Sequence, residues 1–108
     1  MKGDLRVMWL IVFFDLPVVE EEERKAANQF RQFLKQDGFL MLQLSVYARI
    51  CYTQEAVDKH LARVRNNTPE KGSIRALTVT DKQYARMEVL LGKKKLEESI
   101  GSQQLLFF

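Results

Sequence analysis

The fold is decided by the stretch VMWLIVFFDLP at residues 7–17. Residues 7–14 are all apolar, and aromatic and β-branched side chains dominate among them. Such a run, with no polar residue to mark an outward face, predicts a strand buried on both faces of a sheet. It ends abruptly at Asp15, which Leu16 and Pro17 follow. An acid at the mouth of a buried strand is either a turn residue or a group that holds a metal ion or a proton.

Residues 20–36 have the pattern of an amphipathic helix that follows this strand. Their apolar side chains recur at helical spacing and predict one buried stripe. The stripe consists of Ala26, Ala27, Phe30, Phe33 and Leu34. The acids at residues 20–23 complement the positive end of the helix dipole, and Gly38 can end the helix in the left-handed conformation. We therefore interpret the acidic cluster as a helix start rather than as a cation-binding patch.

The middle of the chain predicts two further strands and a second helix. Residues 39–52 are rich in Phe, Leu, Val, Ile and Tyr, which favours two short strands or one strand bent near Ser45. Helical spacing returns at Gln54–Arg65, with Thr53 as the expected N-cap. Residues 66–72 contain Asn, Pro and Gly and predict a loop.

The last part of the chain predicts a strand, a short helix and an apolar end. Apolar residues alternate through Ser73–Thr80, which is typical of a strand, and residues 81–91 fit a short helix closed by Gly92. The inward side chains of that helix are expected to be Tyr84, Met87, Val89 and Leu90. Residues 93–104 have the composition of a polar linker, and residues 105–108 form the last apolar segment.

The order of these elements fits a ferredoxin-like α+β sandwich (βαββαβ) with both helices on one face of an antiparallel sheet. We expect residues 1–92 to form this domain, and residues 93–108 to form a linker and an extra C-terminal strand that completes a sheet edge. That edge belongs either to the same protomer or to a partner. The strand at residues 7–14 would leave an apolar face bare, which predicts a homodimer packed through the sheets. The expected interface residues are Val12, Phe14, Val46, Tyr47, Leu106 and Phe108.

The composition describes an ordinary globular protein of one domain. It has 108 residues, 46% of them hydrophobic and 29% charged. Cys51 is the only cysteine, which excludes an internal disulfide. The run at residues 7–14 is shorter than the ~20 residues of a membrane helix, so we expect a cytoplasmic protein with no membrane partner. A net charge of +3 permits binding to a polyanion without demonstrating it.

Most catalytic constellations are missing from the sequence. It has one histidine and one cysteine, with no Gly-rich phosphate loop and no Cys/His metal spacing, which argues against covalent catalysis. We interpret His60 as a boundary or partly buried helix residue and Cys51 as a small core residue. Asp15 is the exception. In a two-fold dimer built on its strand, the Asp15 pair would approach the axis, where Mg²⁺ and basic residues suit phosphodiester hydrolysis.

The sequence resembles the CRISPR-associated protein 2 family over nearly the whole chain, most closely its members from type II systems. The resemblance rests on motifs in a fixed order rather than on any single motif. These are FFDLP at 13–17, ERKA at 23–26, Phe30, Arg31, Phe33, Leu34, Gly38, Phe39, QLSVY at 43–47, Asn67, Pro69, Lys71, Gly72 and LTVTDKQYARM at 77–87.

This resemblance implies a ferredoxin-like homodimer with Mg²⁺-dependent endoribonuclease activity and a place between integrase dimers during spacer acquisition. Asp15 matches the family's metal-binding aspartate and is the catalytic candidate. Arg24 and Arg31 match basic positions of the first helix. Further candidates for nucleic-acid binding are Lys35, Arg75, Lys82 and Arg86. One departure is Phe14, where many members carry Tyr, because it removes a hydroxyl that could orient water or a phosphate.

Three functions remain open from the sequence. The first is a rigid dimeric bridge that binds double-stranded prespacer DNA through its backbone and contacts the CRISPR integrase subunit. The second is an enzyme in which Mg²⁺ at the Asp15 pair activates water to cleave RNA or DNA. A stand-alone, toxin-like metal-dependent ribonuclease is the variant of this hypothesis outside CRISPR. The third is a single-stranded RNA module in which Tyr47 or Tyr52 stacks on bases.

Overall fold

A four-stranded antiparallel sheet forms the centre of the protein. The computed structural model describes residues 6–92. The strands are β1 (Met8–Asp15), β2 (Leu40–Gln43), β3 (Val46–Cys51) and β4 (Ser73–Thr80), in the spatial order β2-β3-β1-β4. With helices between them, these strands have the expected ferredoxin-like α+β arrangement. The segment expected to hold two strands or one bent strand contains two, β2 and β3.

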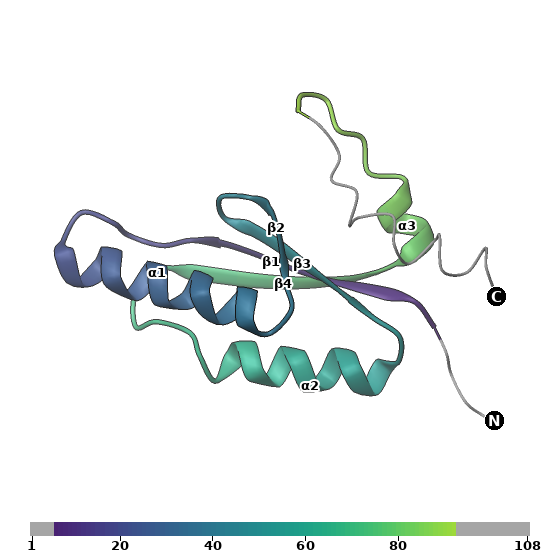
Figure 1. Ribbon diagram of the computed structural model, residues 1–108, viewed down its shortest axis with the longest axis horizontal. Helices are drawn as coiled ribbons and strands as arrows, with labels where there is room; N and C mark the ends of the chain where they lie inside the picture. The colour runs from purple at the N-terminus through teal and green to yellow at the C-terminus, as the bar shows by residue number, and fades with distance from the viewer. Residues whose placement is uncertain (1–5, 93–108) are drawn as a thin grey trace.

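Helices α1 (Glu21–Gln36) and α2 (Gln54–Arg65) lie on the same side of the sheet (Figure 1). The side chains of Glu20 and Glu23 form a capping box at the start of α1, which confirms that the acids belong to the helix start. Gly38 follows the helix with a φ of 91°, a conformation that glycine adopts without strain. The backbone N–H of Ala56 donates to the Thr53 side chain at 3.0 Å, as expected for the N-cap of α2.

The main core fills the space between the sheet and these two helices. Alternate residues of β1 point into it, and Leu10 and Val12 are completely buried there. Tyr47 and Phe14 pack in the same cluster with α1 and α2, with exposures of 0% and 8%. Val12, Phe14 and Tyr47, which the sequence analysis expected at the dimer interface, are thus buried against the helices of their own chain.

The third helix is shorter than expected. Helix α3 spans Asp81–Ala85, and of its predicted inward residues only Tyr84 is buried. Met87, Val89 and Leu90 lie beyond the helix and are exposed, at 42%, 43% and 90%. The expectation of a helix over residues 81–91 with these side chains inward is therefore wrong.

Several predicted features lie outside the described residues. They are the linker at residues 93–104, the strand at residues 105–108, and the interface residues Leu106 and Phe108. Within residues 6–92, none of the helices combines the length and the apolar character that crossing a bilayer requires.

Candidate functional site

The side of the sheet opposite α1 and α2 presents a second apolar surface, here called the open face. The antiparallel register places Trp9 and Ile11 of β1 beside apolar residues of both β3 and β4. Phe13 has an apolar partner on β3 only. The open face consists of Trp9, Ile11, Phe13, Leu42, Val46, Ala48, Ile50, Leu77 and Val79. Phe13 is 37% exposed and Leu77 is 53% exposed, so much of this surface has no cover within the described chain.

One end of the open face is covered by α3. The Tyr84 ring stacks on the Trp9 indole with centroids 4.1 Å apart and planes 10° from parallel. The indole Nε1 donates a hydrogen bond of 2.8 Å to the Asp81 carboxylate. Figure 1 shows α3 beyond one end of the sheet, on the side away from α1 and α2. The contact with Trp9 leaves the other end of the open face, around Phe13, uncovered.

Asp15 lies at this uncovered end. It is the last residue of β1, it is exposed, and it pairs with Ser73 of β4 in the antiparallel register. The adjacent open-face pair is Phe13 with Arg75, and Arg75 is also exposed. The structure therefore places a carboxylate, a hydroxyl and a guanidinium on neighbouring positions at the rim of an apolar surface.

The backbone around Asp15 is held from both neighbouring strands. The N–H of Phe14 donates to the carbonyl of Ser45 at 3.0 Å, which joins the end of β1 to the turn before β3. On the β4 side, Gly72 has a φ of 109°, and a Cβ there would lie 2.8 Å from the Asp15 carbonyl oxygen. Only glycine fits this close approach. The position of Asp15 is thus fixed by the loop that leads into β4.

Asp15 can supply only some of the ligands that a metal ion needs. Within residues 6–92, there is no cluster of three or more His, Cys, Asp or Glu side chains that could hold a metal ion. Mg²⁺, however, is commonly held by one or two carboxylates, with water and phosphate oxygens completing its octahedron. A solvent-exposed aspartate suits that mode. The remaining ligands would have to come from water, from a nucleic acid or from a second protein chain.

Phe14, the departure from the family pattern, does not share a face with Asp15. Successive strand residues alternate between faces, and the Phe14 ring contacts Phe30 and Tyr47 on the helix side, at centroid distances of 5.2 and 5.8 Å. A hydroxyl on this ring would lie on the side of the sheet opposite the Asp15 carboxylate. The missing hydroxyl therefore takes no group away from the immediate surroundings of Asp15.

The basic candidates on α1 have structural contacts of their own. Arg24 donates to the carbonyl oxygen of Val19 at 2.7 Å, in the loop before the helix. Arg31 donates to the carbonyl of Leu44 at 3.2 Å, and its guanidinium lies 5.7 Å from the centre of the Phe14 ring. Because a guanidinium has five N–H donors, these contacts leave donors for a phosphate.

The remaining basic candidates are not gathered with these two. Lys35 is exposed in the last turn of α1, and Arg75 is exposed on the open face. Lys82 is in α3 and Arg86 caps that helix, at the opposite end of β4 from Asp15. The structure brings together Arg75 and Asp15 but distributes the other bases over α1 and α3.

His60 is more deeply buried than the sequence indicated. It is 4% exposed, and its Nδ1 lies 2.8 Å from the Asp37 carboxylate, which also accepts from Arg63 at 2.8 Å. This network ties α2 to the end of α1. The contact with Asp37 could not be predicted from helical periodicity, because Asp37 lies 23 residues away in the sequence. Its burial and its contact with Asp37 make His60 a packing residue between the two helices.

Cys51 has no reactive character. Its side chain is buried, and burial raises the pKa of the thiol, an effect that the Arg49 guanidinium opposes. A thiol with a raised pKa is a poor nucleophile at neutral pH. The interpretation of Cys51 as a small core residue is confirmed.

Comparisons with known proteins give one consistent result. The family model described as CRISPR associated protein Cas2 matches residues 8–87. A protein from Flavobacterium psychrophilum described as CRISPR-associated endoribonuclease Cas2 is 47% identical over 103 residues, covering 95% of this chain and 90% of its own. Proteins of the same description from Acidovorax ebreus and Streptococcus mutans are 45% and 42% identical. They cover 94% and 93% of this chain, and 100% and 92% of their own.

Proposed function

This chain belongs to the CRISPR-associated protein Cas2 family, and we propose that it is a Mg²⁺-dependent endoribonuclease that works as a homodimer in CRISPR adaptation. One observation carries the proposal: Asp15 is exposed at the rim of an apolar sheet face that the chain itself leaves largely uncovered. The relatives named above are endoribonucleases by description, which supports the same activity here.

The open face supports the homodimer. Leu77 and Phe13 are 53% and 37% exposed on a face where most side chains of β1, β3 and β4 are apolar and Arg75 lies at the rim. A second copy of the chain offers the same surface, and two-fold packing of identical patches is the commonest closed assembly. In such a dimer the Asp15 side chains of the two protomers approach the axis and form a pair of carboxylates.

The chemistry proposed at this pair is hydrolysis of a phosphodiester. Bound Mg²⁺ supplies a Lewis acid for a phosphoryl oxygen and lowers the pKa of a coordinated water. Asp15 provides carboxylate oxygens as ligands, and Arg75, on the adjacent register pair, attracts the phosphate. Ser73, directly opposite Asp15, offers a hydroxyl that can donate to a phosphate or to water. Because the pair would form at the interface, cleavage depends on the dimer.

The role in adaptation is proposed from the basic residues. Arg24, Arg31 and Lys35 lie along α1, while Lys82 and Arg86 lie at the far end of the sheet. A double-stranded prespacer that spans the dimer would meet these bases along its phosphate backbone, without sequence readout. In this role the dimer bridges integrase subunits, and the DNA lies across it.

Cleavage of RNA by the full chain tests the enzymatic proposal. We expect Mg²⁺-dependent cleavage that EDTA abolishes and that Asp15→Asn reduces at least about 100-fold, because the substitution removes a metal ligand. Asp58→Asn, at an exposed acid of α2 that accepts a hydrogen bond from Gln54, is the matched control and keeps full activity. Equal cleavage by wild type and Asp15→Asn would assign the activity to a contaminant.

Binding to short duplex DNA tests the structural role separately. We expect affinity to fall steeply with salt, because phosphate contacts release counterions, and to survive Asp15→Ala. Affinity that is independent of salt, or no binding at all, would contradict the bridging role while leaving the cleavage result intact.

A further inference from the structure

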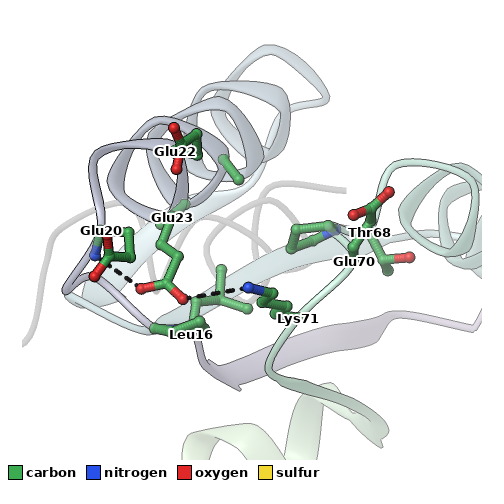
Figure 2. Close-up of a pocket in the computed structure, with 11 residues that line it drawn as sticks. Leu16, Glu20, Glu22, Glu23, Thr68, Glu70 and Lys71 are labelled. Carbon is green, nitrogen blue, oxygen red and sulfur yellow. Dashed lines mark hydrogen bonds and ion pairs between the residues drawn. The ribbon is translucent and has the colours of Figure 1, made fainter.

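A pocket of about 340 Å³ lies on the helix side of the molecule, away from the open face. It is formed where the loop after β1, the first turns of α1 and the loop between α2 and β4 meet (Figure 2). Its size is within the range of sites that hold a large side chain or a small ligand. Its apolar lining consists of Leu16, Pro17, Ala26, Ala27 and Pro69.

The other lining residues give this apolar pocket an acidic rim. Glu20, Glu22, Glu23 and Glu70 line it, with Lys71 as the only base. The rim is therefore negative on a chain whose net charge is +3. Such a field repels nucleic-acid phosphates, so the pocket is unsuited to the ligand proposed for the basic surfaces.

Part of the rim is already engaged within the chain. Glu23 accepts from the backbone N–H groups of Glu20 and Val19 at 2.9 and 3.1 Å, and its second oxygen lies 3.8 Å from the Lys71 ammonium. Glu20 completes the capping box at the start of α1. These two carboxylates stabilise the helix start, and Lys71 compensates one of them.

Glu22 and Glu70 are left as the free acids of the pocket. Glu22 belongs to α1 and Glu70 to the loop before β4, and Figure 2 shows them on different sides of the pocket. Neither side chain has a hydrogen bond or an ion pair with any residue in the described range 6–92. No group of three acidic, His or Cys side chains in that range is suited to hold a metal ion, so a lone cation is a poor occupant.

We propose that this pocket docks a segment of a protein partner that carries an apolar side chain next to a lysine or arginine. The apolar side chain fills the floor against Ala26 and Leu16, and the neighbouring cation lies between Glu22 and Glu70. The proposal rests on charge complementarity together with the apolar lining, and it does not depend on nuclease activity. The pocket lies on the opposite side of the sheet from the proposed dimer surface, so a partner can bind while the open face is occupied.

A pair of short peptides tests the proposal on the full chain. Acetyl-Leu-Arg-Leu-amide and acetyl-Leu-Glu-Leu-amide are titrated into the isotope-labelled protein, and backbone amide shifts are recorded by NMR. We expect the arginine peptide to shift the amides of residues that line the pocket, and the glutamate peptide to shift them at least about fivefold less, because its charge is repelled.

Two variants assign the effect to the pocket. Glu22→Gln combined with Glu70→Gln is expected to weaken binding of the arginine peptide about fivefold, because it removes both free charges. Ala26→Arg fills the floor with a side chain of good helix propensity and should abolish binding. Glu21→Gln is the matched control, because Glu21 is exposed in the same helical turn but does not line the pocket.

The proposal is overturned by any of three results. They are equal shifts with both peptides, unchanged affinity in the double variant, and shifts at the same amides produced by Mg²⁺ alone or by duplex DNA. Because Glu22 and Glu70 have no part in the proposed metal site, RNA cleavage by the double variant should equal that of the wild type. Failure of peptide docking and failure of the nuclease proposal are therefore separate outcomes.

Discussion

The two faces of the sheet share the same strands but differ in what covers them. On the helix side, Leu10 and Val12 of β1 are completely buried beneath α1 and α2. On the open face, Phe13 of the same strand is 37% exposed and Leu77 of β4 is 53% exposed. A single apolar run thus serves two purposes. The covered face forms the core of the fold, and the open face leaves apolar area exposed that the proposed dimer would bury.

The two ends of the open face differ as well. At the start of β1, α3 covers Trp9 through a stacked ring and a hydrogen bond. At the end of β1, Asp15 and Arg75 border apolar surface that the described chain leaves bare. The uncovered end is therefore the place where a second copy can complete the proposed metal site.

The largest expected effect is loss of the covered core. Leu10→Ala should lower the free energy of unfolding by about 2–5 kcal/mol, because it leaves a cavity in a site with no exposure. Leu77→Ala is the same deletion on the open face and should cost about 1 kcal/mol or less in the monomer. Urea titrations of both variants make the measurement. Equal losses of unfolding free energy in the two variants would mean that the open face contributes as much to monomer stability as the covered core.

A charge on the open face should act on association rather than on folding. Leu77→Glu is expected to weaken the proposed dimer by about 2 kcal/mol or more, roughly 30-fold in the dissociation constant, because the interface would bury an unpaired carboxylate. Sedimentation equilibrium measures the change. Gln32→Glu, on the exposed side of α1, adds the same charge and should leave the dimer unchanged. Dimers that persist in both variants would place the interface elsewhere.

The elements that local pattern specifies were predictable from the sequence. The bounds of α2 and β4 agree with the expected ones, and α1 begins one residue later than expected, with Glu20 as its N-cap. Capping residues and helical periodicity are local signals, so they remain readable without tertiary information. The position of Asp15 at the end of β1 followed from the same kind of local signal.

The sequence pattern could not say which face of the sheet each side chain of β1 takes. Because residues 7–14 are apolar throughout, no alternation distinguishes Val12, on the helix side, from Phe13, on the open face. Past α3, the apolar residues Val89 and Leu90 suggested a longer helix, although they are exposed. Hydrophobicity indicates that a residue is to be covered, but it does not say whether the cover comes from the same chain.

A third prediction concerns the end of the open face that α3 covers. Asp81→Ala should lower the free energy of unfolding by about 1.5 kcal/mol, because it removes a charged acceptor from the Trp9 indole. Urea titration measures the loss, and the fluorescence of Trp9, the only tryptophan, reports its exposure. Lys82→Ala, next in the same helix and exposed, is the control. If the two variants lose equal stability, α3 is not held by this contact.

The smallest expected effect on stability is at the Tyr47 hydroxyl on the covered face. Tyr47 is completely buried, and within the described chain its hydroxyl has no hydrogen-bond partner. Tyr47→Phe should therefore leave stability at pH 7 unchanged or raise it by about 1 kcal/mol, because an unsatisfied polar group is removed. Urea titrations of wild type and variant at neutral pH measure the difference.

The pH dependence of the stability of wild type and Tyr47→Phe provides a sharper test. Burial raises the pKa of Tyr47 above its ordinary value of 10.0, an effect that Arg31 partly opposes. As the pH rises past 10.0, the unfolded chain loses this proton before the folded protein does, so the wild type loses stability. Tyr47→Phe has no such proton, and all other titrating groups are common to both proteins. The free energy of unfolding of Tyr47→Phe relative to the wild type should therefore increase above that pH. Parallel profiles of stability against pH would instead mean that the hydroxyl is solvated within the fold.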